Sequence, residues 1–201
     1  FTPSIEVDLC GHATLASARI LFDYYPDRAG EEINLDSKSG NLKVTKCNDG
    51  LCLNFPADQP IEKKIDSLFI EILDIEPLKL LRGKDDYLAV FENQKQIEDM
   101  QPKLSLLKKI NARGLVISAP GDEVDFVSRC FYPEAGIEED PVTGSAHTML
   151  TPYWANEFNK EDLEGHQLSR RGGKLNCRLA NDRVYISGNS VIYFEGTISI
   201  V

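Results

Sequence analysis

The sequence predicts an α+β fold built from two pseudo-symmetric lobes, each a mostly antiparallel sheet or barrel that curls around one central apolar helix. The main observation is an internal repeat, because residues 1–13 and 131–146 share the words Phe-x-Pro, Ile-Glu-x-Asp and Gly-x-Ala in the same order. Each copy is followed by a helix-like run of small and apolar residues and then by several strand-like segments. Helices between most strands, which a parallel α/β sheet requires, are absent from the pattern. A sheet curled around a central helix therefore accounts for the order of elements.

In the first lobe, residues 5–9 alternate apolar and acidic side chains and are expected to form a short strand. Residues 13–24 predict a helix with few polar positions, so we expect protein to surround it. Strands are predicted at residues 32–38, 42–46 and 51–55. The last two are separated by an Asn-Asp-Gly turn, which is typical of a hairpin.

The second lobe is expected to begin after a linker at residues 56–60, which starts and ends with proline. Its apolar helix is predicted at residues 145–158, with composition similar to that of the first. The other predicted helices are 65–73 and 94–109, the latter interrupted by Pro102, and the predicted strands are 78–82, 87–91, 114–119, 125–132, 167–170, 174–179, 183–187 and 190–201. We therefore divide the chain into a partial first lobe at 1–60 and a second lobe at 61–194, and expect a strand near 195–201 to return to the first lobe.

The repeat also predicts how many residues should precede its first copy. About 70 residues precede the second copy within its own lobe, whereas none precede the first copy, which starts at Phe1. If the two lobes match, on the order of 60–70 residues belong ahead of Phe1. We therefore expect this chain to be part of a longer protein.

The bulk composition disfavours several classes of function. Hydrophobic residues make up 42% and charged residues 27% of the 201 positions, which is ordinary for a globular protein. The net charge of −10 argues against non-specific binding of nucleic acid. No apolar run approaches the roughly 20 residues that span a bilayer. We expect a cytoplasmic protein with neither nucleic acid nor membrane as a partner.

The five cysteines are odd in number, scattered and without a Cys-x-x-Cys pair, which fits a reducing compartment. The three histidines lie far apart in the sequence, and no set of His and Cys residues has the spacing of a structural zinc site. No metal site is therefore predicted.

Two helix starts, at Gly11-His12 and at Gly144-Ser145, occupy equivalent positions in the repeat. A helix N-terminus offers unpaired N–H groups and the positive end of the helix dipole. If the lobes pack about a pseudo-two-fold axis, both starts can face one cleft and favour a carboxylate ligand. The alternative is that the glycines merely allow tight turns.

Polar side chains near these starts are the candidate site residues. His12 is expected to contact the ligand as a neutral imidazole, which the positive helix end favours. Asp140 precedes a proline, which favours extended backbone, and it could accept a proton-bearing group of a substrate or orient His12. The alternative for Asp140 is a helix N-cap. His147 is expected to pack or cap, and Glu138 and Glu139 to be solvated.

Cys10 raises a different hypothesis, because a thiol beside a helix N-terminus can have a lowered pKa and act as a base. A racemase that uses two thiols would need a second cysteine at the equivalent place in the other lobe. Thr143 occupies that place. The thiol-pair mechanism is therefore disfavoured.

Three motifs resemble the PhzF-like phenazine biosynthesis isomerase family. They are Asp-Leu-Cys-Gly-His-Ala-Thr at residues 8–14, Glu-Asp-Pro-Val-Thr-Gly-Ser-Ala-His at 139–147 and Ser-Arg-Arg-Gly-Gly at 169–173. The similarity covers essentially the whole chain. It implies a diaminopimelate epimerase-like fold with the active site between two lobes, which is the architecture that the repeat predicts.

The resemblance also implies a function. The site would be lined by Gly11, His12, Asp140, Gly144 and Ser145, and the reaction would be a cofactor-independent proton shift on a small carboxylated substrate. His12 and Asp140 would bind and orient the polar groups of the substrate. The general acid/base of the family is a glutamate upstream of the Phe-x-Pro stretch, so it is expected ahead of Phe1, and Glu6 does not match its position.

Two other functions stay open. A protein that keeps the fold but lacks the glutamate would be a non-catalytic binding or interaction protein. A racemase or epimerase is the third possibility. Relatives of this family often form dimers, so a homodimer is an expectation from the resemblance.

Overall fold

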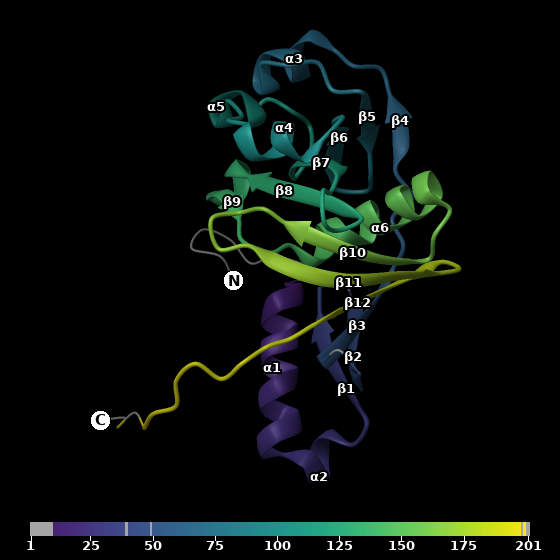
Figure 1. Ribbon diagram of the computed structural model, residues 1–201. Helices are drawn as coiled ribbons and strands as arrows, with labels where there is room; N and C mark the ends of the chain where they lie inside the picture. Colours follow the sequence, from purple (N-terminus) through teal and green to yellow (C-terminus); the bar gives the residue numbers. More distant parts are fainter. Residues whose placement is uncertain (1–9, 39, 49, 198, 200–201) are drawn as a thin grey trace.

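The computed structural model describes residues 10–38, 40–48, 50–197 and 199. Within this part of the chain the fold is α+β, and all its strands belong to one open, mixed sheet that runs through both halves of the molecule (Figure 1). The order across the sheet is β1-β2-β3-β12-β11-β10-β8-β7-β6-β5-β4, and β9 pairs with β8 away from this path. The α+β class is confirmed, but the described sheet does not close into a barrel.

The bounds of the elements follow the chain. The strands are β1 (Glu32–Ser37), β2 (Gly40–Cys47), β3 (Gly50–Pro56), β4 (Ile61–Lys63), β5 (Lys79–Arg82), β6 (Asp86–Val90), β7 (Gly114–Pro120), β8 (Phe126–Tyr132), β9 (Ile137–Asp140), β10 (Asp162–Gln167), β11 (Gly173–Ala180) and β12 (Arg183–Gly188). The helices are α1 (Gly11–Tyr24), α2 (Pro26–Ala29), α3 (Ser67–Leu73), α4 (Gln94–Asp99), α5 (Leu104–Leu107), the 3-10 turn η1 (Pro133–Ala135) and α6 (Gly144–Phe158).

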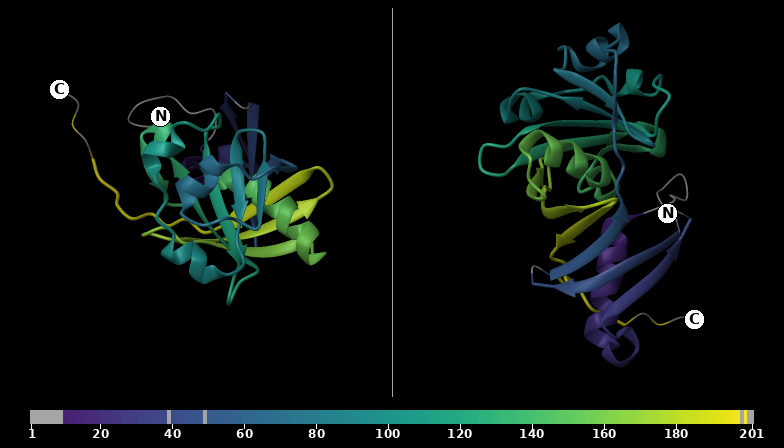
Figure 2. Two further views of the ribbon diagram at one scale, coloured as in Figure 1. Left: turned by 90° about the horizontal axis from the view of Figure 1, so that it is seen from above. Right: turned by 90° about the vertical axis from the view of Figure 1, so that its right-hand side faces the viewer.

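In the first lobe, α1 packs along the antiparallel strands β1, β2 and β3 (Figure 2). Its buried residues are Gly11, Thr14, Ala18 and Phe22, which form one stripe at the spacing of an amphipathic helix. The prediction that protein surrounds this helix is wrong for the described residues. The hypothesis of a further segment ahead of Phe1 stays a prediction.

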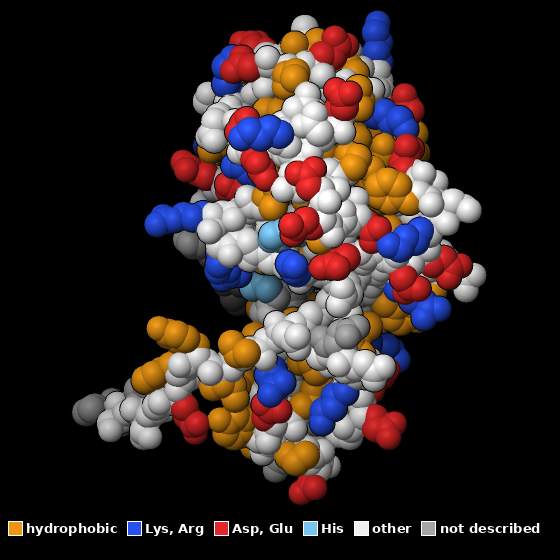
Figure 3. Space-filling view, viewed as in Figure 1, with side chains coloured by type: hydrophobic (Ala, Val, Ile, Leu, Met, Phe, Trp, Pro, Cys, Tyr) orange, Lys and Arg blue, Asp and Glu red, His pale blue; other side chains and the backbone are white. Residues whose placement is uncertain are grey.

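The uncovered side of α1 is partly apolar. Ile20 is 41% exposed and Tyr24 is 47% exposed. Residues 189–197 run past this helix without forming a strand, and Glu195 accepts a hydrogen bond of 2.9 Å from the Tyr24 hydroxyl. Figure 3 shows apolar side chains gathered where the C-terminal segment passes the first lobe.

In the second lobe, α6 is buried on all sides. Ten of its 15 residues are buried: Gly144, Ala146, His147, Met149, Leu150, Thr151, Pro152, Tyr153, Trp154 and Ala155. The helix contacts β10, β11 and β12, and its N-terminal end meets α1. This is the central apolar helix that the sequence predicts for the second lobe.

Two hydrophobic clusters lie on opposite faces of the sheet. One contains residues of both central helices, for example Ala18 and Leu150, together with side chains of β2, β3, β11 and β12. The other lies beneath α3, α4 and α5 and includes Ile72 and Ile97. The first cluster therefore extends through both lobes.

Several predicted elements are corrected by the structure. The strand predicted at 167–170 instead ends at Gln167, as β10. The helix predicted at 94–109 is split into α4 and α5 around Pro102, because proline lacks the N–H that a continuous helix needs. The strand predicted at 190–201 is absent from residues 190–197. The strand that joins the first lobe near the end of the chain is β12, which pairs antiparallel with β3.

Two strand pairs are parallel, β6 with β7 and β10 with β8. The linker after β3 is anchored to the second lobe, because the Asp58 N–H donates to the Thr148 carbonyl oxygen at 3.0 Å and the Asp58 carboxylate accepts from the Lys84 N–H. The division of the chain at residue 60 stays a prediction. The strand predicted at residues 5–9 lies outside the described residues.

Candidate active site

The N-termini of α1 and α6 meet at two glycines. Gly11 and Gly144 are the first residues of their helices, as the repeat predicts. A Cβ added to Gly11 would lie 3.3 Å from the Gly144 Cα, and one added to Gly144 would lie 3.4 Å from the Gly11 Cα. A side chain at Gly11 would therefore crowd the backbone of the facing helix, whereas a Cβ at Gly144 would be at the limit of ordinary contact.

Neither helix start has the usual side-chain cap among the described residues, and neither helix has an acidic residue in its first turn. Elsewhere in the chain, Asp66 caps α3 and Asn93 forms a capping box at α4. Two positive helix ends in contact repel each other, and their unpaired N–H groups favour an anion. This junction can therefore bind a carboxylate.

His12, the second residue of α1, lies beside the thiol that precedes the helix. The Cys10 Sγ lies 3.4 Å from the His12 Nε2. This contact lowers the pKa of the Cys10 thiol and raises the pKa of His12 above its ordinary value of 6.5. This shift opposes the expected preference for a neutral imidazole, because the contact with Cys10 favours the protonated ring.

His12 also faces the second lobe. The charge of Asp140 and the backbone carbonyl of Val142 both raise the pKa of His12 further. The ring from the first lobe is thus placed against the loop that leads from β9 into α6. The structure brings His12 and Asp140 together, as the sequence predicts, although they lie in different repeats.

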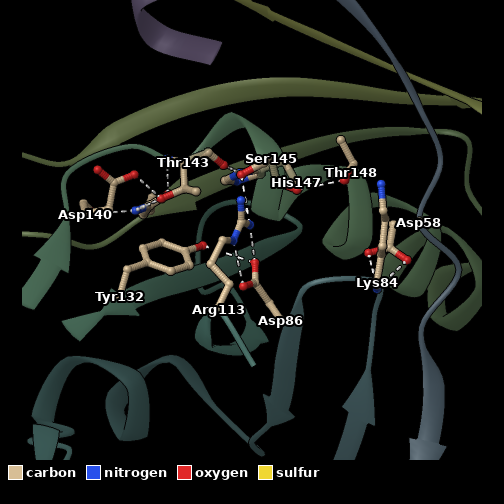
Figure 4. A network of polar contacts seen from close by, with 11 residues as sticks. Asp58, Lys84, Asp86, Arg113, Tyr132, Asp140, Thr143, Ser145, His147 and Thr148 are labelled. Carbon is tan, nitrogen blue, oxygen red and sulfur yellow. Dashed lines mark hydrogen bonds and ion pairs between the residues drawn. The ribbon is translucent and has the colours of Figure 1, made fainter. Parts of the chain in front are cut away.

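Asp140 is held by hydrogen bonds from residues around it. The Thr143 hydroxyl donates to the Asp140 carboxylate. The Gln167 amide donates to the Asp140 carbonyl oxygen at 2.6 Å and accepts from the Thr143 N–H at 2.8 Å, and Figure 4 shows Thr143 beside Asp140. The N-cap of α6 is Thr143, so the alternative that Asp140 is the cap is wrong.

His147, the fourth residue of α6, has a different environment. Its side chain is fully buried, and its Nδ1 lies 2.8 Å from the Thr143 carbonyl oxygen. Burial lowers the pKa of His147 to about 4. The ring is therefore neutral at pH 7, its Nδ1–H donates to that carbonyl, and it packs against Phe126. This agrees with the prediction that His147 packs.

Ser145 belongs to a second polar cluster that the sequence does not reveal. The Arg113 Nη2 donates to the Ser145 Oγ at 3.1 Å, and the same guanidinium binds the carboxylate of Asp86. The Tyr132 hydroxyl donates to Asp86 at 3.4 Å. Neither Arg113 nor Asp86 belongs to a motif, so no signal in the sequence could have identified them.

The turn after β10 lies beside the same loop. Ser169 donates to the Pro141 carbonyl oxygen at 2.7 Å and accepts from the Gly172 N–H at 3.0 Å. Ser169, Arg170 and Arg171 line a hollow of about 390 Å³ with Glu139 and Pro141. The two arginines therefore place positive charge in a hollow that they share with Glu139 and Pro141.

Other expectations have mixed outcomes. Glu138 is exposed, as predicted. Glu139 is not free in solvent, because Arg129 binds it through two hydrogen bonds of 2.7 and 3.0 Å. Asp8 lies outside the described residues.

Within the described part of the chain, no group of three or more His, Cys, Asp or Glu side chains could hold a metal ion. None of the helices in that part has the length and apolar character needed to cross a membrane.

Comparison with known proteins identifies clear relatives. A family model described as "Phenazine biosynthesis-like protein" matches residues 1–196. A protein of Pseudomonas aeruginosa named an uncharacterized isomerase is 43% identical over 200 residues, which cover 100% of this chain and 76% of that protein. Another uncharacterized isomerase, from Halalkalibacterium halodurans, is 42% identical over 194 residues, which cover 95% of this chain and 73% of that protein.

Solved structures show the same fold. A PhzF family protein from Enterococcus faecalis superimposes with a TM-score of 0.92 at 39% identity, covering 100% of this chain and 76% of that one. A putative PhzC/PhzF protein from Clostridium difficile gives a TM-score of 0.91 at 36% identity, covering 100% and 77%. A protein of Pseudomonas aeruginosa described as a predicted epimerase, at 17% identity and a TM-score of 0.61, shares the fold alone.

Proposed function

Because the chain belongs to the phenazine biosynthesis-like family, we propose that it is a cofactor-independent isomerase, which moves a proton between two carbons of a small carboxylated substrate. The observation that carries the proposal is the junction of two uncapped helix starts at Gly11 and Gly144, beside His12 and Asp140. The names of the relatives support the class of reaction. The geometry supports the binding of an anion at this place.

The uncapped helix starts would hold the carboxylate of the substrate. Backbone N–H groups that point at an anion need no reorganisation when charge develops in the transition state. When a proton leaves the carbon next to a carboxylate, negative charge spreads onto the carboxylate oxygens. Donors placed there therefore lower the barrier to proton removal.

His12 and Asp140 would bind and orient the polar groups of the substrate. The raised pKa of His12 gives it a larger protonated fraction near neutral pH, so the ring is suited to donate a hydrogen bond. The Asp140 carboxylate accepts a hydrogen bond from the Thr143 hydroxyl. Its remaining lone pairs can accept a hydrogen bond from a hydroxyl or amino group of the substrate. Both side chains would fix the substrate relative to the proton-transferring group.

The proton-transferring group in this proposal is a glutamate upstream of Phe1, as the resemblance to the family implies. Among the described residues, Asp140 is the carboxylate that lies against His12. Its hydrogen bonds suit it to orientation. The proposal therefore applies to the full-length protein.

The test is incorporation of deuterium from D2O into a substrate such as trans-2,3-dihydro-3-hydroxyanthranilate by the full-length protein, followed by mass spectrometry. We expect His12→Ala and Asp140→Asn to slow incorporation by about 100-fold each, which is typical for loss of a positioned polar group. Glu138→Gln, an exposed change in the same loop, is the matched control and should leave the rate unchanged. Unchanged rates in both site variants would contradict the assignment.

Two outcomes would favour the other functions. A protein that binds the carboxylate but exchanges no deuterium would be a binding protein with this fold. A protein that racemises free amino acids would act as a racemase, although the hydroxyl of Thr143, at the position equivalent to Cys10, already donates to Asp140.

A further inference from the structure

The guanidinium of Arg113 is fixed by a buried carboxylate. Arg113 immediately precedes β7, and its N–H donates to the Asp85 carbonyl oxygen at 2.8 Å. The Arg113 Nε donates to the Asp86 carboxylate at 3.0 Å, and the Arg113 Nη2 donates to the second oxygen of that carboxylate. Asp86 is 3% exposed. A two-point contact with a buried acid leaves the guanidinium little freedom to turn.

An aromatic ring restrains the guanidinium further. The central carbon of the Arg113 guanidinium lies 5.1 Å from the centre of the Tyr132 ring, and the Tyr132 hydroxyl donates to the same Asp86 carboxylate. Burial and the charge of Asp86 hold the pKa of Tyr132 well above its ordinary value, so its hydroxyl keeps the proton that it donates. The cluster is therefore a rigid support on the side of β6 and β7.

This cluster extends to the start of α6 through Arg113. The Arg113 Nη2 donates to the Ser145 Oγ at 3.1 Å, and Figure 4 shows Arg113 reaching Ser145 from the strands β6 and β7. Ser145 directly follows Gly144, the residue that touches Gly11. Ser145 is therefore the residue next to the junction where the proposed function places the substrate.

The direction of this hydrogen bond fixes the role of the serine hydroxyl. A guanidinium has only donors, so the Ser145 oxygen must accept from it. The single hydroxyl proton is then available to another partner, because the Ser145 hydroxyl donates no hydrogen bond among the described residues. A hydroxyl that accepts from a cation is also a stronger donor, since linked hydrogen bonds polarise one another.

We propose that Arg113 is a positioning residue, which fixes Ser145 as a hydrogen-bond donor to an acceptor oxygen of the substrate. The oxygen is anionic, belonging to a carboxylate or to the enolate that forms from it. A ligand that presents a hydroxyl proton or an ammonium group at this point is disfavoured. The inference rests on the proposed function for the place of the substrate, but its test needs only binding.

The experiment is calorimetric titration of the full-length protein with 2-aminobenzoate and with its neutral analogue 2-aminobenzamide. We expect Ser145→Ala to weaken binding of 2-aminobenzoate by at least about tenfold, the lower end for a hydrogen bond to a charged group. Arg113→Lys keeps the charge next to Asp86, but its ammonium cannot reach both partners in the fixed geometry of the guanidinium. We expect it to weaken binding about threefold to tenfold, and binding of 2-aminobenzamide to change less than twofold in both variants.

The double variant decides the mechanism. Because Arg113 acts through Ser145, Arg113→Lys should have no further effect in the Ser145→Ala background. If Arg113→Lys does not fold, Asp86→Asn replaces it, because this change weakens the hold of Asp86 on the Arg113 guanidinium. Asp86→Asn should likewise weaken binding of 2-aminobenzoate and have no further effect in the Ser145→Ala background. Arg82→Lys is the matched control, because Arg82 also stacks on a tyrosine, with its guanidinium carbon 5.0 Å from the ring centre of Tyr87. Its guanidinium donates to the Asn111 carbonyl oxygen and makes no hydrogen bond with α6 among the described residues.

The outcomes separate the two proposals. Additive losses, or an Arg113→Lys affinity equal to that of the unmodified protein, would overturn the positioning role while leaving the proposed function in place. An unmodified protein that binds neither compound would overturn the carboxylate site itself, and this inference with it.

Discussion

Two histidines near the starts of the central helices show how environment decides the state of one residue type. His12 lies on the exposed side of its helix, next to Cys10 and opposite Asp140, and these contacts raise its pKa. His147 is fully buried, and desolvation lowers its pKa to about 4. One ring is therefore suited to donate to a ligand, whereas the other is a neutral part of the core.

The buried ring predicts a loss of stability in acid. The folded-state pKa of His147 is about 4, below the 6.5 of an ordinary histidine, so the unfolded state binds more protons between these two values. Its contribution to stability is therefore present above pH 6.5 and is lost as the pH falls toward 4. Between pH 7 and pH 5 the loss should be about 2 kcal/mol.

His147→Asn removes the titrating group, while its amide can still donate to the Thr143 carbonyl oxygen. Urea denaturation at pH 7 and pH 5 should show that the variant loses about 2 kcal/mol less over this interval than the unmodified protein. Leu150→Val, a buried change in the same helix without a titrating group, should lower stability equally at both pH values. An equal loss in His147→Asn and the unmodified protein would mean that His147 is not the group responsible.

Residue positions given by the repeat could be predicted from the sequence, and those given by strand register could not. Gly11 and Gly144 meet because they start equivalent helices. Arg113 reaches Ser145 because β6 and β7 are parallel neighbours in one register, which pairs Asp86 with Gly114. A parallel pairing of distant segments leaves no local pattern, so this cluster appears only in the structure.

At the scale of elements, the close contact between α1 and α6 depends on the absence of side chains at their first residues. Gly11→Ala would place a Cβ 3.3 Å from the Gly144 Cα, which is tighter than usual packing and pushes the helix starts apart by a few tenths of an ångström. Alanine also favours the helix by up to about 1 kcal/mol relative to glycine. These effects oppose each other in stability, and the crowding leaves the helix starts displaced.

We therefore expect Gly11→Ala to change the free energy of unfolding by less than about 1 kcal/mol and to weaken 2-aminobenzoate binding by about tenfold or more, since displaced donors lose their geometry. Denaturation and calorimetric titration measure the two quantities. Gly188→Ala is the control, because its Cβ would meet only the Lys174 carbonyl oxygen, at 4.0 Å, and no atom of α1 or α6 within that distance. Unchanged affinity in Gly11→Ala would show that the contact does not shape the site.

Elements with strong local signals were predicted well. The hairpin of β2 and β3 forms at the Asn-Asp-Gly turn, where Gly50 has a φ of +118°, a conformation that glycine adopts without strain. The sequence pattern predicts Gln167 at the beginning of a strand, but this residue ends β10, and its fully buried amide donates to the Asp140 carbonyl oxygen. This tertiary role is not visible in the local sequence.

At the scale of the molecule, the two lobes share one sheet and one core. The pairing of β12 with β3 connects strands from opposite ends of the chain, and Leu53 lies opposite Ile186 in that register. Two lobes could be predicted from the repeat, because the same short motifs occur twice in the sequence in the same order. The continuous sheet could not, since it depends on which exposed strand edges meet.

A shared core predicts that both lobes unfold together. Leu53 is 4% exposed, belongs to the cluster that contains both central helices, and has its Cδ1 3.9 Å from where a Gly11 Cβ would lie. Leu53→Ala should cost about 2–5 kcal/mol by leaving a cavity. In scanning calorimetry we expect one transition, lowered as a whole by about 5–15 °C, with equal calorimetric and van't Hoff enthalpies. Leu73→Ala, in the cluster on the opposite face, should lower the same transition. If either variant instead moves only part of the heat absorption and splits the peak, the lobes unfold independently, and the β3–β12 junction does not couple them.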